Sequence, residues 1–375
     1  MKMSDPPPGD RMGGPVVSGH RMLAVMADRS AAAPVLRPSS ASGRRPAAPV
    51  LALDLGASRI RVAVVAPDGR ILARRDGRTP GANGPDAVVA ACIDHLRAVR
   101  DDAGPAIAGR LAGVGLSAPG PVDPRAGTLV EPPNIGPGFR DVQFAAPIGL
   151  ALGLPAALER DTHVAALGEL AFGVARGSRD FIYLTVSTGF GGAIVVGGRL
   201  YGGPDGMAGE LGHLPVDLDG PPCGCGGRGH IEALCSGSGI ARLATEAVRS
   251  GRSPALAARL AARAPGPLAG RDVAEAADAG DSEAVAIMDR ARRAFAALLV
   301  GLVDAFAPER IVVGGSLADA QGERLLGPAR EAVATTAFRI PRDRVQIVPA
   351  ALGDDVGLVG AVPLLALRGH STRAV

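Results

Sequence analysis

The feature that most constrains the fold is a unit that occurs twice: an apolar strand, a short glycine-containing loop and a second apolar strand. The first copy covers residues 49–65 and has its loop at residues 54–59. The second covers residues 181–196, with its loop at residues 187–192. Short apolar runs bounded by glycine are typical of buried strands. A helical spacing over residues 86–102 and another apolar run at 111–116 follow the first unit. The sequence therefore predicts a mixed α/β protein that repeats one construction in each half.

Both loops have the composition of a phosphate-binding turn. In the first loop, Gly56 lets backbone amides approach an anion, Ser58 offers a hydroxyl, and Asp54 can hold Mg²⁺ through water. The second loop offers three glycines and two hydroxyls, and its candidate residues are Thr188, Gly189, Gly191 and Gly192. A glycine-rich β-hairpin with no ligand explains either loop alone, but two such loops favour ATP.

A cluster of potential metal ligands lies between residues 206 and 232. His213, Cys223, Cys225 and His230 are separated mostly by Gly, Pro and Asp, so no long helix or strand holds them apart. Two thiolates and two imidazoles suit a closed, four-coordinate structural zinc site. The alternative is a glycine-rich surface loop with two incidental thiols.

Composition limits the function classes. A chain of 375 residues is long enough for two domains, and it contains no apolar run that could span a membrane. The net charge of +3 is small and dispersed, so we expect no nucleic-acid partner and no membrane partner. Four cysteines, three of them clustered, predict a reducing cytoplasm rather than a disulfide framework. Residues 1–48 are rich in Pro, Ala, Ser and Gly, which predicts a disordered extension.

The metal-ligand segment resembles that of the ROK family of sugar kinases and sugar-responsive regulators. Residues 209–213 match its Gly-Glu-x-Gly-His segment, and residues 223–232 match its Cys-x-Cys-Gly-x-x-Gly-Cys-x-Glu segment. The one departure is His230, which replaces the third cysteine. The resemblance implies a structural Zn²⁺ held by two Cys and two His, with Cys235 as the substitute ligand if His230 does not bind.

The resemblance extends from residue 50 to about residue 369 and implies an actin-like ATPase (ribonuclease-H-like) fold, in which two α/β domains flank a cleft. We expect an N-terminal domain of residues 49–163 plus 354–375 and a C-terminal domain of residues 164–353 that carries the zinc loop. In this family the turn at Gly314 and Gly315 lies beneath the adenine and ribose.

The same resemblance assigns the chemistry to Asp161. Residues 159–169 match a family segment that reads Glu-Asn-Asp-x-Asn followed by Ala-Ala-x-Gly-Glu, and Asp161 takes the position of its catalytic carboxylate. Its role would be the general base for the attacking sugar hydroxyl. A helix N-cap is the structural alternative, and the two roles are compatible. Arg160 and His163 replace the two asparagines of the family segment. Arg160 can pair with Asp161 and lower its pKa, recognise an anionic or unusually substituted sugar, or mark a member without catalysis.

Four further residues would hydrogen-bond the sugar if the resemblance holds: Asn134, Glu210, His213 and Glu232. The sequence is thus identified as that of a ROK-type ATP-dependent kinase that phosphorylates the 6-hydroxyl of a hexose, glucose or an N-acetylhexosamine, with Mg²⁺. We expect a homodimer from the family. The alternatives are a non-catalytic sugar sensor or regulator, a zinc hydrolase, which would need an open metal position, and a kinase with polyphosphate as donor.

Overall fold

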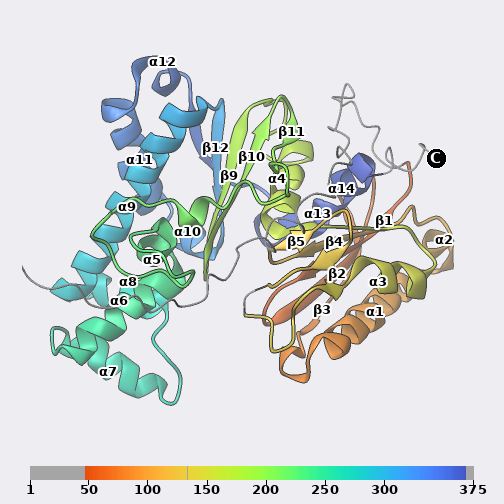
Figure 1. Ribbon diagram of the computed structural model, residues 1–375, viewed down its shortest axis with the longest axis horizontal. Coiled ribbons are helices and arrows are strands. Elements are labelled where there is room, and N and C mark those ends of the chain that lie inside the picture. The colour runs from red at the N-terminus through yellow and green to blue at the C-terminus, as the bar shows by residue number, and fades with distance from the viewer. Residues whose placement is uncertain (1–46, 133, 369–375) are drawn as a thin grey trace, which may run out of the picture. The chain divides into compact units, whose positions relative to one another are not determined.

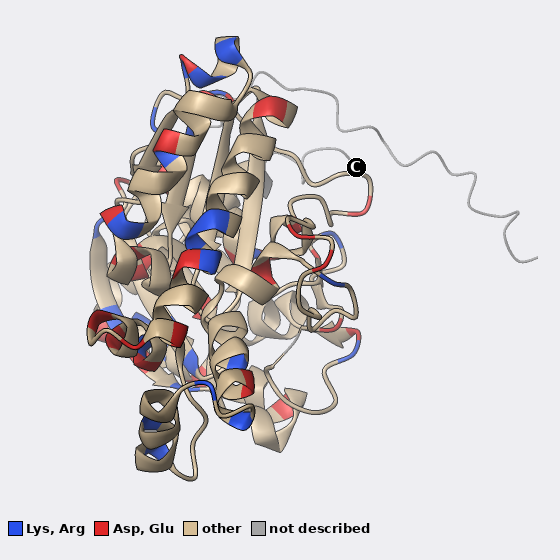
Figure 2. Cartoon of the chain, turned by 90° about the vertical axis from the view of Figure 1, so that its left-hand side faces the viewer, with Lys and Arg blue, Asp and Glu red and all other residues tan. Residues whose placement is uncertain are grey.

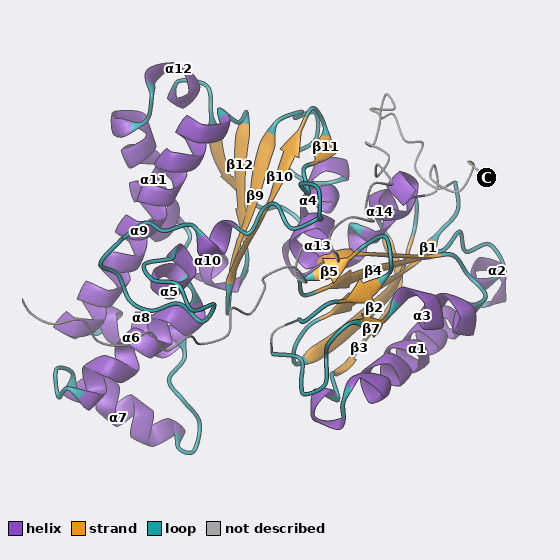
Figure 3. Ribbon diagram, viewed as in Figure 1, coloured by secondary structure: helices purple, strands orange, loops and turns teal. Residues whose placement is uncertain are grey.

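The structure is a computed structural model that describes residues 47–132 and 134–368. The disordered extension expected over residues 1–48 therefore falls almost entirely outside the described residues, as do the last seven residues of the expected N-terminal domain. The described chain contains two five-stranded sheets and a small three-stranded one (Figures 1 and 3).

The first sheet has the strand order β3-β2-β1-β4-β8. Strands β1 to β3 form an antiparallel meander, while β4 and β8 run parallel to β1. All six residues of β1 are buried, because both faces of the sheet are covered by helices. The bounds are β1 Val50–Leu55, β2 Arg59–Val65, β3 Ile71–Arg78, β4 Val114–Ala118 and β8 Ala156–Arg160.

The second sheet repeats this construction with the order β11-β10-β9-β12-β13. Strands β9, β10 and β11 are again antiparallel to their neighbours, while β12 and β13 run parallel to β9. The repeat seen in the sequence thus extends to the whole sheet. Its strands are β9 Phe181–Val186, β10 Phe190–Val196, β11 Arg199–Leu200, β12 Arg310–Gly314 and β13 Gln346–Pro349.

Helices cover both faces of the first sheet. On one face, α1 (Pro85–Asp102) and α3 (Ala145–Leu152) enclose the core around Leu53, Val62 and Leu116. On the other face lie α13 (Val356–Val359) and α14 (Ala361–Arg368), from the end of the described chain. The small sheet joins β5 Val122–Asp123, β6 Thr128–Leu129 and β7 Val142–Gln143, and α2 is Pro105–Ala108.

The largest core lies on one face of the second sheet and is built mainly by α9 (Ser282–Phe306) and α11 (Glu323–Thr336). The opposite face packs against α4 (Asp161–Ala171), which also contacts α13 and α14. The remaining helices are α5 Ile231–Cys235, α6 Gly237–Arg249, α7 Pro254–Arg263, α8 Gly270–Asp278, α10 Ser316–Gln321 and α12 Arg339–Arg342.

Residues of both charges are interspersed along the helices on the face that Figure 2 shows. Among the helices of the second half, Arg324 pairs with Asp278 at 2.5 Å and Arg330 with Glu323 at 2.7 Å. No large field of one sign therefore covers this face. Within residues 47–132 and 134–368, no helix is both long enough and apolar enough to cross a membrane.

Candidate functional site

Three polar residues meet where the parallel strands of the first sheet end. Asp54 lies near the end of β1, Ser117 lies near the end of β4, and Asp161 directly follows β8. Ligands of α/β proteins bind at the carboxyl ends of such strands. This edge of the sheet is therefore the candidate site.

Asp54 is buried and engaged on both oxygens. Arg61 approaches its Oδ2 at 2.6 Å, and the Ser117 hydroxyl donates to its Oδ1 at 2.9 Å. Burial raises the pKa of Asp54, although Arg61 and Ser117 act against that shift. The carboxylate expected to hold Mg²⁺ is thus neutralised by Arg61 in this structure, a residue that the sequence analysis did not single out.

Asp161 is half-buried and is the first residue of α4. Its Oδ1 accepts a hydrogen bond from the Thr162 backbone N–H at 2.7 Å. Arg160 takes the N-cap position, so the expectation that Asp161 caps the helix is wrong by one residue, because the chain leaves β8 directly into the helix. Loss of solvation, followed by the charge of Asp54, raises the pKa of Asp161 to about 6. A carboxylate that titrates this close to neutral pH suits proton transfer.

Arg160 does not pair with Asp161. Its side chain is 3% exposed, and its guanidinium donates to Glu210 Oε1 and, at 2.6 Å, to the carbonyl of Ala208. The positive charge of Arg160 acts to lower the pKa of Asp161, but burial outweighs it. Of the three interpretations of Arg160, the direct pair that weakens the base is therefore wrong, because the side chain points to the segment before residue 211.

His163 is held on both ring nitrogens. Nδ1 lies 3.0 Å from Glu159 Oε1, and Nε2 lies 2.7 Å from an Arg160 Nη2. A guanidinium can only donate hydrogen bonds, so Nε2 accepts from Arg160. Nδ1 therefore carries the hydrogen and donates a hydrogen bond to Glu159. Glu159, His163, Arg160 and Glu210 therefore form one connected chain of polar contacts, which we call the Arg160 network.

The first glycine loop is a tight turn between β1 and β2. The Gly56 N–H bonds the Arg59 carbonyl at 2.8 Å, and the Gly56 carbonyl accepts from the Thr79 hydroxyl at 2.7 Å. Ser58 is exposed beside it. The hydroxyl expected to contact phosphate thus faces solvent.

The second glycine loop is held by two neighbouring segments of the chain. The Ser187 hydroxyl lies 2.9 Å from that of Ser316, which follows Gly314 and Gly315 at the start of α10. The backbone N–H groups of Gly237 and Ser238 donate to Ser187 and Thr188 at 2.8 and 3.0 Å. The second loop and the Gly314–Gly315 turn therefore lie side by side.

The sequence predicts Gly191 and Gly192 in the loop, and this prediction is wrong. Both residues lie within β10. A Cβ atom on Gly191 would come within 2.7 Å of Thr162 Cγ2, and one on Gly192 within 2.6 Å of Leu211 Cδ1. Glycine at these positions lets α4 and the segment that carries Glu210 approach the strand closely. Thr188 and Gly189 remain in the turn.

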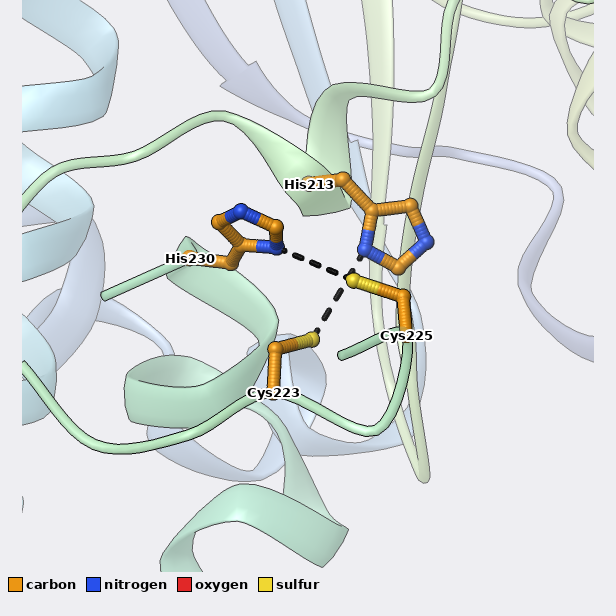
Figure 4. Close-up of side chains that lie close together, drawn as sticks. All are labelled: His213, Cys223, Cys225 and His230. Carbon is orange, nitrogen blue, oxygen red and sulfur yellow. Dashed lines mark hydrogen bonds between the residues drawn. The ribbon is translucent and has the colours of Figure 1, made fainter. Parts of the chain in front are cut away.

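The four candidate metal ligands come together (Figure 4). Their donor atoms all lie within 4.8 Å of one another. Cys223 Sγ lies 3.8 Å from His213 Nδ1, and Cys225 Sγ lies 3.3 Å from His230 Nδ1. Tetrahedral zinc with bonds of about 2.0–2.3 Å separates its ligand atoms by about 3.3–3.8 Å. Both thiol–imidazole pairs lie within this range, and two thiols with two imidazoles are a donor set that suits that ion.

Cys235 is not part of this group. It is 1% exposed within the core of the second half, and burial raises its pKa to about 12. It is therefore an apolar core residue, and the substitution of Cys235 for His230 as a ligand has no support in the structure.

The residues expected to contact sugar are only partly assembled. Glu210 and His213 flank a 3₁₀ turn, Leu211–His213, and Glu210 Oε2 lies 4.0 Å from His213 Nε2. Glu232 Oε2 accepts from the Phe190 N–H at 3.0 Å, which ties the zinc loop to the second glycine loop. Asn134 is exposed with a φ of 66°, and none of the contacts described for the chain joins it to Asp161.

Comparisons with known proteins agree with this geometry. The family model described as "ROK family" matches residues 50–367. A glucokinase from Thermotoga maritima is 32% identical over 319 residues, which is 85% of this chain and 98% of the relative. An N-acetylmannosamine kinase from Escherichia fergusonii is 31% identical over 84% of this chain and 97% of the relative.

A solved structure is also similar. The crystal structure of a ROK family glucokinase from Streptomyces griseus in complex with glucose and AMPPNP has a TM-score of 0.69 and 33% identity. The match covers 84% of this chain and 98% of that one. Together with the duplicated sheet order, this likeness confirms the actin-like ATPase fold expected from the sequence.

Proposed function

The chain belongs to the ROK family, and we propose that it transfers the γ-phosphoryl group of ATP to the 6-hydroxyl of a hexose, with Asp161 as the general base. Relatives named as glucokinases and as an N-acetylmannosamine kinase align over most of the chain. The chain is accordingly an ATP-dependent sugar kinase. The names of these relatives support glucose or an N-acetylhexosamine as the proposed acceptor.

The observation that carries the proposal is the position and state of Asp161. It stands at the carboxyl edge of the first sheet, near enough to Asp54 for that charge to raise its pKa, which lies at about 6. A base whose pKa is near the operating pH is ionised yet able to accept a proton. Asp161 takes the proton of the sugar hydroxyl as the hydroxyl oxygen attacks the γ-phosphorus of ATP, and ADP leaves.

We assign phosphate and nucleotide binding to the two glycine loops and the Gly314–Gly315 turn. Thr188 and Gly189 in the second loop, with the Ser58 hydroxyl in the first, would offer N–H and hydroxyl donors to phosphate oxygens, whereas the Gly56 N–H already bonds the Arg59 carbonyl. Gly314 and Gly315 form the turn that would lie beneath the adenine and ribose, as the family resemblance implies. Gly191 and Gly192 contribute by letting neighbouring segments approach β10. Asp54 would hold Mg²⁺ through water once Arg61 gives up its contact with Oδ2, and the ion would neutralise phosphate charge.

His213, Cys223, Cys225 and His230 would hold a structural Zn²⁺. A closed set of four protein ligands leaves no position for water activation, which argues against the zinc hydrolase. The ion would fix His213 through Nδ1 and leave its Nε2 toward Glu210, so it would orient a proposed sugar contact. The homodimer expected from the family remains a prediction, which sedimentation analysis would check.

A coupled ADP-release assay with Mg·ATP tests the function. The panel comprises glucose, mannose, N-acetylglucosamine, N-acetylmannosamine and one acidic sugar, and Asp161→Asn is the matched variant. We expect turnover on one or two neutral sugars and a loss of about 10²–10⁴-fold in Asp161→Asn. Turnover on the acidic sugar alone would mean that the Arg160 charge selects the substrate.

Absence of turnover on every sugar, in a folded protein that binds one of them, would favour the non-catalytic sensor. Turnover with polyphosphate but not with ATP would overturn the choice of donor.

A further inference from the structure

Arg160 differs from its family counterpart, and its side chain is built into the candidate site rather than onto its surface. It extends from the last residue of β8 and is 3% exposed, while its partner Glu210 is 46% exposed above it. Arg160 therefore contacts a carboxylate group that is itself partly exposed and whose second oxygen, Oε2, lies 4.0 Å from His213 Nε2.

The protein leaves space for this guanidinium. A Cβ atom on Gly120 would fall 3.0 Å from Arg160 Cδ, and one on Gly209 would fall 3.2 Å from an Arg160 Nη2. Gly120 lies just after the end of β4, and Gly209 directly precedes Glu210. Arg160 therefore fills the space between the chain after β4 and the segment that carries Glu210.

From this geometry we propose that Arg160 is a positioning residue for sugar binding: it holds Glu210 in place through Oε1, so that Oε2 faces the sugar. The inference rests on the proposed function, because Glu210 is taken as a sugar contact. Arg160 also bonds the Ala208 carbonyl two residues earlier, which fixes the backbone that carries Glu210. His163 Nε2 contacts the same Nη2 that bonds the Ala208 carbonyl, and Glu159 in turn holds the His163 ring.

Two physical effects follow from this arrangement. A carboxylate fixed before the sugar arrives loses less conformational entropy on binding, so the sugar binds more tightly. The charge of Arg160 also offsets that of Glu210, which would otherwise add to the repulsion that Asp161 experiences from Asp54. Geometry and charge can therefore be separated by substitution.

Arg160→Lys keeps the charge but loses the planar fork, which binds several partners at once. We expect the Kd for sugar to rise about tenfold, with little change in the pH profile of kcat/KM. Arg160→Asn removes both the fork and the charge. For this variant we expect at least the same rise in Kd, and the acid limb of the pH profile should move to higher pH.

The sugar Kd would be measured by calorimetry with glucose and with N-acetylmannosamine in the absence of nucleotide, and the Kd of an ATP analogue would serve as an internal control. Arg259→Ala is the matched control, because Arg259 pairs with Glu275 at 2.8 Å on the surface of α7. Arg259→Ala should leave the Kd values for glucose, N-acetylmannosamine and the ATP analogue unchanged. Thermal unfolding would establish that each variant is folded, and Arg160→Lys decides the question if Arg160→Asn does not fold.

A sugar Kd that stays within about threefold of wild type in Arg160→Lys would overturn the inference, as would tighter sugar binding in Arg160→Asn. Binding of neither sugar by the wild type would also overturn it. The kinase proposal fails separately: a wild type that binds sugar without turnover refutes the kinase, whereas the effect of Arg160 on Kd still decides the positioning role.

Discussion

The substitution Asp161→Asn is expected to change activity and stability in opposite directions. Asp161 has a pKa of about 6 in the folded protein and an ordinary value of 3.8. A carboxyl group whose pKa is raised by folding stabilises the protein below its unfolded value, and this contribution is lost as pH rises through the folded value. Above pH 6 the ionised Asp161 is therefore a cost that asparagine does not carry.

The cost can be estimated from the shift of about two units. At about 1.4 kcal/mol per unit, discounted because the side chain is partly exposed, it is on the order of 1–3 kcal/mol. Asp161→Asn should raise the Tm by roughly 2–6 °C at pH 7.5. The gain should shrink between pH 6 and pH 4 and vanish below, while activity is lost at every pH.

Differential scanning calorimetry of both proteins between pH 4 and pH 8, alongside kcat/KM, provides the assay. With a pKa of about 6, the ionised fraction of Asp161 falls about tenfold between pH 7 and pH 5, so kcat/KM should fall about tenfold over that interval. A Tm for Asp161→Asn that is equal to or lower than that of the wild type at pH 7.5, with a flat pH profile down to pH 5, would refute the reasoning.

Three further predictions concern the supports of the site. His230→Ala should abolish stoichiometric zinc and lower the Tm, whereas His230→Cys and Cys235→Ala should each retain one zinc per chain by elemental analysis; zinc retained in His230→Ala would refute the ligand set. Glu232→Ala removes the acceptor of the Phe190 N–H and should raise the Kd of an ATP analogue about 3–10-fold in the absence of sugar; an unchanged Kd would mean that the loop holds itself. Glu169→Ala deprives three backbone N–H groups of their acceptor and should lower the free energy of unfolding by about 2–5 kcal/mol in urea titrations. Glu169→Gln should lower it less. A loss below about 1 kcal/mol in Glu169→Ala would show that water replaces the carboxylate.

The sequence predicts the two strand–loop–strand units well, because apolar runs and glycine turns are local signals. It also brings the four potential metal ligands within one short segment, where a chain without long elements can fold back. The spacing of Asp54 and Arg61 about the first turn also predicts their ion pair, which the sequence analysis does not use. Asp54 and Arg61 are equally far from the turn, so an antiparallel pairing sets them opposite each other.

Other features depend on long-range packing and leave no local trace. The partner of Arg160 is Glu210, fifty residues later, and no spacing rule connects the two. Gly191 and Gly192 read as loop residues, yet they lie in β10 because Thr162 and Leu211 need the space that a side chain would take. Such assignments require the tertiary arrangement.

The central claim is transfer of phosphate from ATP to a sugar with Asp161 as the base. The most direct measurement follows ³²P from γ-labelled ATP in the presence of Mg²⁺ and glucose or N-acetylmannosamine, with products separated by chromatography. We expect label in a hexose 6-phosphate for the wild type and almost none for Asp161→Asn. Label in inorganic phosphate alone, or equal sugar labelling by Asp161→Asn, would contradict it.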